Sequence, residues 1–331
     1  MTTHDKPTVS ITYDINKIFE CQNDNCVIIK DLEKYCEHTF KTPNIILTEL
    51  MKQMDDITKS HSNGINPNDI ILKSMVRDSL NKIVHSNYRS ILEDLKSLNY
   101  TSENHFSLLA NEIILKSMGD AMACKGIDVP KNGQRTPSEI YVDTAYEFAS
   151  YMIDVDGNPI KFKNVMAKEC QNYFNKFIDK KERMDHNNLT RISNFKGFMN
   201  MIGLLYAVGL FPCHIIDKCF EKITNLVVDT SLPQEECDNY YSGFERLMNR
   251  ILYHFENENH NITNETVQRN KVNDFIEARK MIQKYNELVL TVCPDDGKNS
   301  NPKTLRKFSG MVHNQNMLRF NALCEKYDRT S

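Results

Sequence analysis

The stretch that decides the fold is residues 212–227, PCHIIDKCFEKITNLV. Its apolar side chains recur at intervals of three and four residues, at Ile215, Ile216, Cys219, Phe220, Ile223, Leu226 and Val227. This spacing places them on one face of an α-helix. Pro212 suits the first turn of that helix, where a backbone N–H has no helical partner. The stretch therefore predicts a helix with one buried face and one exposed face.

The same apolar spacing recurs along most of the chain. Alternating strand patterns are almost absent and the sequence has only 11 glycines, so a sheet has little support. Polar segments with glycine and proline separate the periodic stretches. The pattern predicts helices at roughly 43–58, 69–98, 102–124, 137–153, 161–178, 191–208, 212–227, 233–255, 266–291 and 302–327.

Ten or so helices joined by polar loops predict an all-α fold. We expect an α-solenoid of stacked, antiparallel, HEAT-like helix pairs, in which each pair buries its apolar face against its neighbours. Residues 1–40 differ, because they have an acidic excess and only short apolar islands, which predicts a flexible arm with a partner-binding peptide. Leading helices would occupy 41–94, and the repeat scaffold would occupy 95–331.

The composition limits the classes of partner. An apolar fraction of 40% is enough for a substantial core, whereas a net charge of -3 gives no global attraction to phosphate. No apolar run occurs in the first 20 residues, and no stretch approaches the length of a membrane span. We therefore expect a cytoplasmic protein without membrane association. The frequent Asn, Lys and Ile suggest the AT-rich genome of a protist or a large virus, and a viral protein would act in the host cytoplasm.

Three ordered segments carry a family resemblance. They are residues 98–106 (LNYTSENHF), residues 162–174 (FKNVMAKECQNYF), and the segment from Gly197 through Gly203 and Tyr206 to Cys219. Over about residues 95–327 the chain resembles the middle domain of eukaryotic translation initiation factor 4 gamma, a HEAT-repeat stack of five antiparallel helix pairs. Thr101 and Leu204 depart from the family pattern, and a short basic loop replaces an acidic insertion after residue 174.

The resemblance implies a translation initiation scaffold. Such a scaffold grips a DEAD-box RNA helicase, holds its two lobes in a productive orientation and contacts mRNA weakly. The resemblance implies that the opening turn takes part in helicase binding. The corresponding candidates here are Leu98, Tyr100 and Phe106. Ordinary packing of the first helix hairpin is the alternative explanation for these three residues.

A second resemblance lies in the arm. Tyr13 is followed by four residues and then by Ile18 and Phe19, which resembles the docking peptide for a cap-binding translation initiation protein. On a short helix this peptide could lay an apolar edge into a groove of its partner. The alternative is that Ile18 and Phe19 pack the arm onto the first helices.

Basic residues concentrate between positions 161 and 196. A patch of this kind could neutralise several phosphates, so RNA binding would weaken as salt rises. A solvated face without a partner is the competing explanation. The RNA-binding candidates are Lys161, Lys163, Lys168, Lys180, Lys181, Arg183, Arg191 and Lys196.

Catalytic and metal-binding signatures fail on inspection. The sequence contains no Gly-rich phosphate loop and no nucleophile elbow. The segment from Asp154 to Asn158 begins like a calcium loop, but its glycine comes too early and Val165 holds the twelfth position. The spacings of Cys21, Cys26, Cys36 and His38 match no familiar zinc site. We expect no enzyme activity, no cofactor and no metal.

Two alternatives to the initiation scaffold stay open. One is a related helical-repeat adaptor in mRNA decay, splicing or translational repression. The other is a direct RNA-binding module, which would bind RNA strongly and in a salt-sensitive manner without a protein partner.

Overall fold

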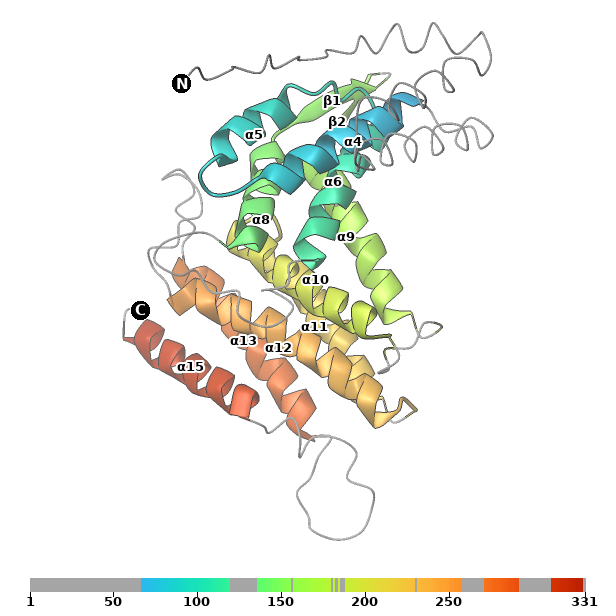
Figure 1. Ribbon diagram of the computed structural model, residues 1–331. Coiled ribbons are helices and arrows are strands. Elements are labelled where there is room, and N and C mark those ends of the chain that lie inside the picture. Colours follow the sequence, from blue (N-terminus) through green and yellow to red (C-terminus); the bar gives the residue numbers. More distant parts are fainter. Residues whose placement is uncertain are drawn as a thin grey trace, which may run out of the picture. The chain divides into compact units, whose positions relative to one another are not determined.

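The structure is a computed structural model that describes residues 67–119, 136–155, 157–179, 181, 184, 188–229, 231–256, 271–291 and 311–329 (Figure 1). These residues form ten α-helices and one two-stranded hairpin. The mainly helical fold predicted from the sequence is therefore confirmed. The expected arm at 1–40 and the expected helix at 43–58 lie outside the described residues.

Most helix bounds agree with the apolar spacing to within a few residues. The helices are α4 (Pro67–Lys82), α5 (Tyr88–Lys96), α6 (Glu103–Met118), α8 (Pro137–Phe148), α9 (Phe162–Ile178), α10 (Leu189–Ala207), α11 (Cys213–Val227), α12 (Gln234–Glu256), α13 (Lys271–Thr291) and α15 (Met311–Asp328).

Contacts between the helices follow two rows. In the first row α6 contacts α9, α9 contacts α11, and α11 contacts α13. In the second row α8 contacts α10, α10 contacts α12, and α12 contacts α15. The helices of the two rows alternate along the chain, and α6 packs on α8 as α11 packs on α12 (Figure 1). Each helix therefore has neighbours both in its own row and in the other.

Polar contacts extend the first row to α4. Asn104 contacts Asp69, Glu112 contacts Arg77, and Lys116 contacts Asn81. Each of these pairs is separated by 35 positions, so α4 and α6 run parallel with α5 returning between them. The Arg77 guanidinium donates to both oxygens of Glu112 at 3.1 and 2.8 Å, which gives this buried carboxylate a two-point partner.

Helix α10 lies at the centre of the core. Every residue from Gly197 to Tyr206 is buried, and the helix contacts α6, α8, α11 and α12. A Cβ on Gly197 would lie 2.5 Å from the carbonyl oxygen of Met118, and one on Gly203 would lie 2.8 Å from Cβ of Arg250. Gly197 and Gly203 therefore each allow the close approach of a neighbouring helix.

One predicted helix is wrong, because residues 69–98 form two helices. The break spans Ile83 to Asn87. The Asn87 side chain accepts from the Val84 N–H at 2.7 Å and donates to the Lys82 carbonyl at 2.8 Å. Asparagine side chains compete in this way with helical backbone hydrogen bonds. Asn87 therefore ends α4 and stands at the N-cap position of α5.

A second difference follows α8, which ends at Phe148 rather than near 153. Strands β1 (Met152–Val155) and β2 (Asn158–Lys161) pair in an antiparallel hairpin. Gly157 has φ of 79°, and its N–H donates to the Asp154 side chain at 2.8 Å. The segment that began like a calcium loop is thus a hairpin turn. An Asp-Gly dipeptide at a turn is the sequence signal for it.

We predict that Gly197→Ala destabilises the fold. In an uncrowded helix this change would stabilise by up to about 1 kcal/mol, but here the new methyl group meets the backbone of α6. The expected loss in the free energy of unfolding is about 1–3 kcal/mol, measured by urea denaturation.

The matched control is Asn194→Ala, at a half-buried position of the same helix. Alanine is the better helix former, so this change should leave the free energy of unfolding unchanged or raise it by about 0.5 kcal/mol. Equal stability of the two variants would contradict the close contact at Gly197.

Candidate functional site

The opening turn places two of the three helicase-binding candidates in the core. Tyr100 and Phe106 are 8% and 0% exposed, whereas Leu98 is partly buried. The Tyr100 ring lies 5.8 Å from Phe106 and 5.7 Å from Phe148, and Phe106 lies 5.6 Å from Phe162. The Tyr100 hydroxyl donates to the Leu95 carbonyl at 3.1 Å. As packed here, these two rings join the turn to α8 and α9 and offer little surface to a partner.

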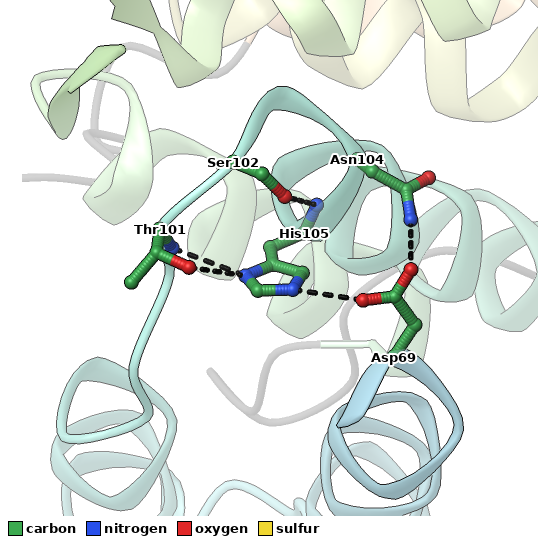
Figure 2. Close-up of polar contacts among 5 residues, drawn as sticks. All are labelled: Asp69, Thr101, Ser102, Asn104 and His105. Carbon is green, nitrogen blue, oxygen red and sulfur yellow. Dashed lines mark hydrogen bonds and ion pairs between the residues drawn. The ribbon is translucent and has the colours of Figure 1, made fainter. Parts of the chain in front are cut away.

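Polar side chains of the same turn hold α4 against α6 (Figure 2). The Ser102 hydroxyl accepts from the His105 N–H at 3.2 Å, which makes Ser102 the N-cap of α6. The His105 ring contacts Asp69 through Nε2 at 2.9 Å and receives the Thr101 N–H at Nδ1 at 3.0 Å. Asn104 also donates to Asp69. We call Asp69, Thr101, Ser102, Asn104 and His105 the α4–α6 clasp.

The clasp has the residue types of a hydroxyl, histidine and carboxylate triad. A triad needs a ring nitrogen whose lone pair is free to take the hydroxyl proton. Here the Thr101 N–H occupies Nδ1, and the Thr101 hydroxyl lies farther from it at 3.4 Å. The same bond leaves Nε2–H to donate to Asp69, so these contacts suit a structural tie better than proton abstraction.

The predicted basic patch is only partly assembled. Lys161, Lys163 and Lys181 are exposed, and Lys180 and Arg183 lie outside the described residues. Lys161 and Lys163 lie at one end of α9 and Lys181 lies beyond the other, about 25 Å away by helix length. These residues therefore follow the length of a helix and do not form one compact cluster.

Two of the remaining candidates have partners within the fold. Lys168 donates to Glu103 of α6 at 2.7 Å. Arg191 donates to the carbonyls of Lys176 and Phe177 at the end of α9, and its guanidinium lies over the Phe177 ring. It therefore satisfies helix-end carbonyls, a structural role that counts against a phosphate contact.

Lys196, the last candidate, is half-buried near Glu245 of α12. Burial raises the pKa of the Glu245 carboxyl to about 7, and the positive charges of Arg246 and Lys196 oppose that rise. The charge of Lys196 therefore acts on the partly buried Glu245 carboxyl and is not confined to an exposed patch.

A different basic surface spans α9 and α11. The Lys222 ammonium lies 3.5 Å from the Asn175 side-chain oxygen and 5.9 Å from the Phe174 ring centroid, and Lys176 lies over Tyr173. Lys218 precedes Lys222 by one turn on the exposed side of α11. The α9–α11 face consists of the exposed residues Gln171, Asn172, Asn175, Lys176, Lys218, Lys222 and Asn225.

The α9–α11 face has the chemistry of a phosphate-binding surface. From Gln171 to Lys176 and from Lys218 to Asn225, Glu221 is the one exposed acid against three lysines and four carboxamides. Lysines neutralise phosphates, and carboxamides donate to phosphate and base oxygens. Sequence inspection missed this face because Lys218 and Lys222 are far from the 161–196 cluster along the chain. The polar side of the 212–227 helix was the available signal.

Neighbouring features add no reactive centre. A shallow hollow beside the face is lined by Ile178, Lys222, Asn225, Leu226 and Asp229. Helix α9 turns Cys170, Phe174 and Phe177 into the core, where all three are buried. Burial raises the pKa of the Cys170 thiol well above its usual value and that of Cys219 to about 12, which disfavours thiolate nucleophiles at neutral pH.

Neither a metal cluster nor a membrane span is found in the part of the chain that the structure describes. No three His, Cys, Asp or Glu side chains among these residues gather as metal ligands. The helices described are all too short or too polar to cross a bilayer. The cysteines and histidine weighed for zinc, and the docking residues Tyr13, Ile18 and Phe19, lie outside the described residues.

In comparisons with known proteins, no protein-family model and no curated protein matches the sequence.

We predict that Glu245→Gln changes stability in a pH-dependent way. The pKa of this carboxyl rises from 4.5 to about 7 on folding, so the folded protein binds the proton more tightly. Its contribution to stability is complete below pH 4.5 and is lost as the pH rises through 7. The glutamine should therefore raise the free energy of unfolding at pH 8 by about 1–3 kcal/mol and have little effect at pH 4. Urea denaturation at both pH values measures this.

The matched control for that experiment is Glu277→Gln, at an exposed position of α13. It should have little effect at either pH. If Glu245→Gln changed the free energy of unfolding by the same amount at pH 4 and at pH 8, that result would contradict the raised pKa of this carboxyl.

We also predict that the α9–α11 face governs any RNA affinity. Replacing Lys176, Lys218 and Lys222 with alanine should make the plot of log affinity against log salt shallower by about 2, because three phosphate contacts are lost. Fluorescence anisotropy with a single-stranded oligonucleotide measures the slope. The control replaces three exposed cations of α4 and α5, Lys73, Lys82 and Arg89, and should leave the slope unchanged. Equal slopes for the two triple variants would exclude this face.

Proposed function

We propose that the chain is a HEAT-like α-solenoid whose role is to hold other macromolecules. The two rows of alternating helices support this architecture, because helices of one row contact in chain order and α4 runs parallel to α6. Each pair then buries its apolar face against the next pair. A surface of this kind extends over several repeats and suits partners larger than small molecules.

The partners that we propose belong to translation initiation in the cytoplasm. The solenoid would bind a DEAD-box RNA helicase, the arm would bind a cap-binding protein through Tyr13, Ile18 and Phe19, and mRNA would contact the basic surface. The observation that carries this proposal is the ordered set of three family-like segments. They fall on the turn that leads into α6, on α9, and on α10 with α11, where Gly197 and Gly203 both have packing roles.

The helicase contact is proposed at the opening turn, but through different atoms from those first expected. Tyr100 and Phe106 are buried, so the side chains available to a partner here are exposed neighbours such as Thr101 and Asn104. The buried rings of Tyr100 and Phe106 would hold the turn in place against α8 and α9. The family's apolar residue at position 101 is absent, which makes a polar helicase contact the more suitable choice for this chain.

Activation of a helicase would follow from unequal affinities. A scaffold that binds one arrangement of the two lobes more tightly shifts the helicase toward it, and only by the difference in binding free energy. No catalytic group of the scaffold need take part.

An RNA-binding module is the second candidate function, and the α9–α11 face is the observation that favours it. Strong RNA affinity without a protein partner would support this candidate. An adaptor in mRNA decay, splicing or translational repression is a third candidate, because it would use the same architecture with other partners.

The proposal is tested by the ATP turnover of a DEAD-box initiation helicase with the full chain added at saturation. We expect turnover to rise at fixed RNA. The matched control is the double variant Tyr13→Ala, Phe19→Ala, which should retain that stimulation while losing the cap-binding protein in a pull-down. Unchanged turnover in a saturated complex would contradict helicase activation. No complex at all, together with tight RNA binding, would favour the RNA-binding module.

A further inference from the structure

The Thr101 and His105 pair in the α4–α6 clasp contains a donor and an acceptor for the same ring nitrogen. The Thr101 N–H donates to Nδ1 of His105 at 3.0 Å, and the Thr101 hydroxyl oxygen lies 3.4 Å from the same atom (Figure 2). A neutral imidazole can accept at Nδ1, whereas an imidazolium can only donate there. We propose that His105 is a proton-dependent switch that exchanges the Thr101 N–H for the Thr101 hydroxyl as the partner of Nδ1.

In the neutral state both ring nitrogens are satisfied. Nδ1 accepts the Thr101 N–H, and Nε2–H donates to the Asp69 carboxylate at 2.9 Å. The bond that fixes the tautomer is therefore a backbone bond within the turn. Because the ring is held at both ends, it ties the turn before α6 to the first turn of α4.

In the protonated state the ring carries hydrogen on both nitrogens. Nδ1–H then opposes the Thr101 N–H, and the nearest acceptor is the Thr101 hydroxyl oxygen. Thr101 is exposed, so its released N–H can donate to water. At the other end Nε2–H keeps Asp69, and the hydrogen bond becomes an ion pair. The clasp survives the change, while the Thr101 N–H moves away from the ring.

The charged group in contact with the ring is the Asp69 carboxylate. The Asp69 and His105 side chains are 19% and 12% exposed, so solvent only partly screens their pairing. The other Asp69 oxygen accepts from the neutral amide of Asn104, which brings no competing charge. Glu103, two positions before His105, is paired with Lys168 of α9. Among the residues that the structure describes, the charged groups at this site are Asp69 from α4, Glu103 from α6 and Lys168 from α9.

The switch gives Thr101 a role within the fold, besides the polar helicase contact proposed for it above. Thr101 is one of the positions where the sequence departs from the family pattern, and its N–H and hydroxyl can serve the two protonation states in turn. Valine has the same shape as threonine but lacks the oxygen, so Thr101→Val separates the two states. Serine keeps the oxygen and is the conservative control.

The test measures the thermal midpoint of the full chain and its Thr101→Val variant at pH 8 and pH 5, where imidazoles are ordinarily neutral and protonated. At pH 8 the two proteins should agree within about 2 °C, because the N–H contact is kept. At pH 5 the variant should melt about 3–6 °C below the parent, because a charge-assisted hydrogen bond is missing. Thr101→Ser should follow the parent at both pH values.

Two further measurements separate the switch from a structural role. In a His105→Gln background, Thr101→Val should have the same effect at both pH values. In the unmodified protein, the amide resonance of Thr101 in a nitrogen-resolved NMR spectrum should move upfield on acidification as its bond to the ring is lost. An equal cost of Thr101→Val at pH 5 and pH 8, or a Thr101 amide that does not respond to pH, would overturn the proposal.

Discussion

Helix α10 can touch α6 on one side and α12 on another because two of its residues have no side chain. Gly197 faces the Met118 carbonyl, and Gly203 faces the Arg250 side chain. With a methyl group at either position the helices would have to separate, and every later contact along the rows would shift with them. The buried pair of Arg250 and Glu139, 3.6 Å apart, depends on the same approach. Burial of α10 on nearly all sides therefore fixes where the other helices lie.

The sequence predicted the helices well wherever one apolar face is enough to define them. The helix predicted at 212–227, with one buried face, is confirmed, and so is the helix predicted at 161–178. Prediction failed where a single polar side chain or a glycine overrides the periodic pattern, as Asn87 does between α4 and α5 and Gly157 does in the hairpin. Apolar spacing reports which face is buried. It does not report a local hydrogen bond that ends a helix.

The candidate sites were harder to predict because charged residues that are close in sequence need not lie close together on the folded surface. Arg191 and Lys168 belong to the basic cluster in sequence, yet one caps α9 and the other pairs with Glu103. Lys218 and Lys222 look unremarkable in sequence, and only the packing of α11 on α9 brings them beside a row of carboxamides. Likewise, Tyr100 and Phe106 are large enough for an interface, but their ring contacts show that the core uses them.

The proposed scaffold function requires a rigid core, because the outer faces must keep their spacing. We place that rigidity in α10, and native-state hydrogen exchange measures it residue by residue. We expect the α10 amides from Phe198 to Tyr206 to exchange most slowly, only through global unfolding, and the amides of α5 to exchange much faster. Exchange from α10 at the rate of α5 would contradict a core organised around this helix.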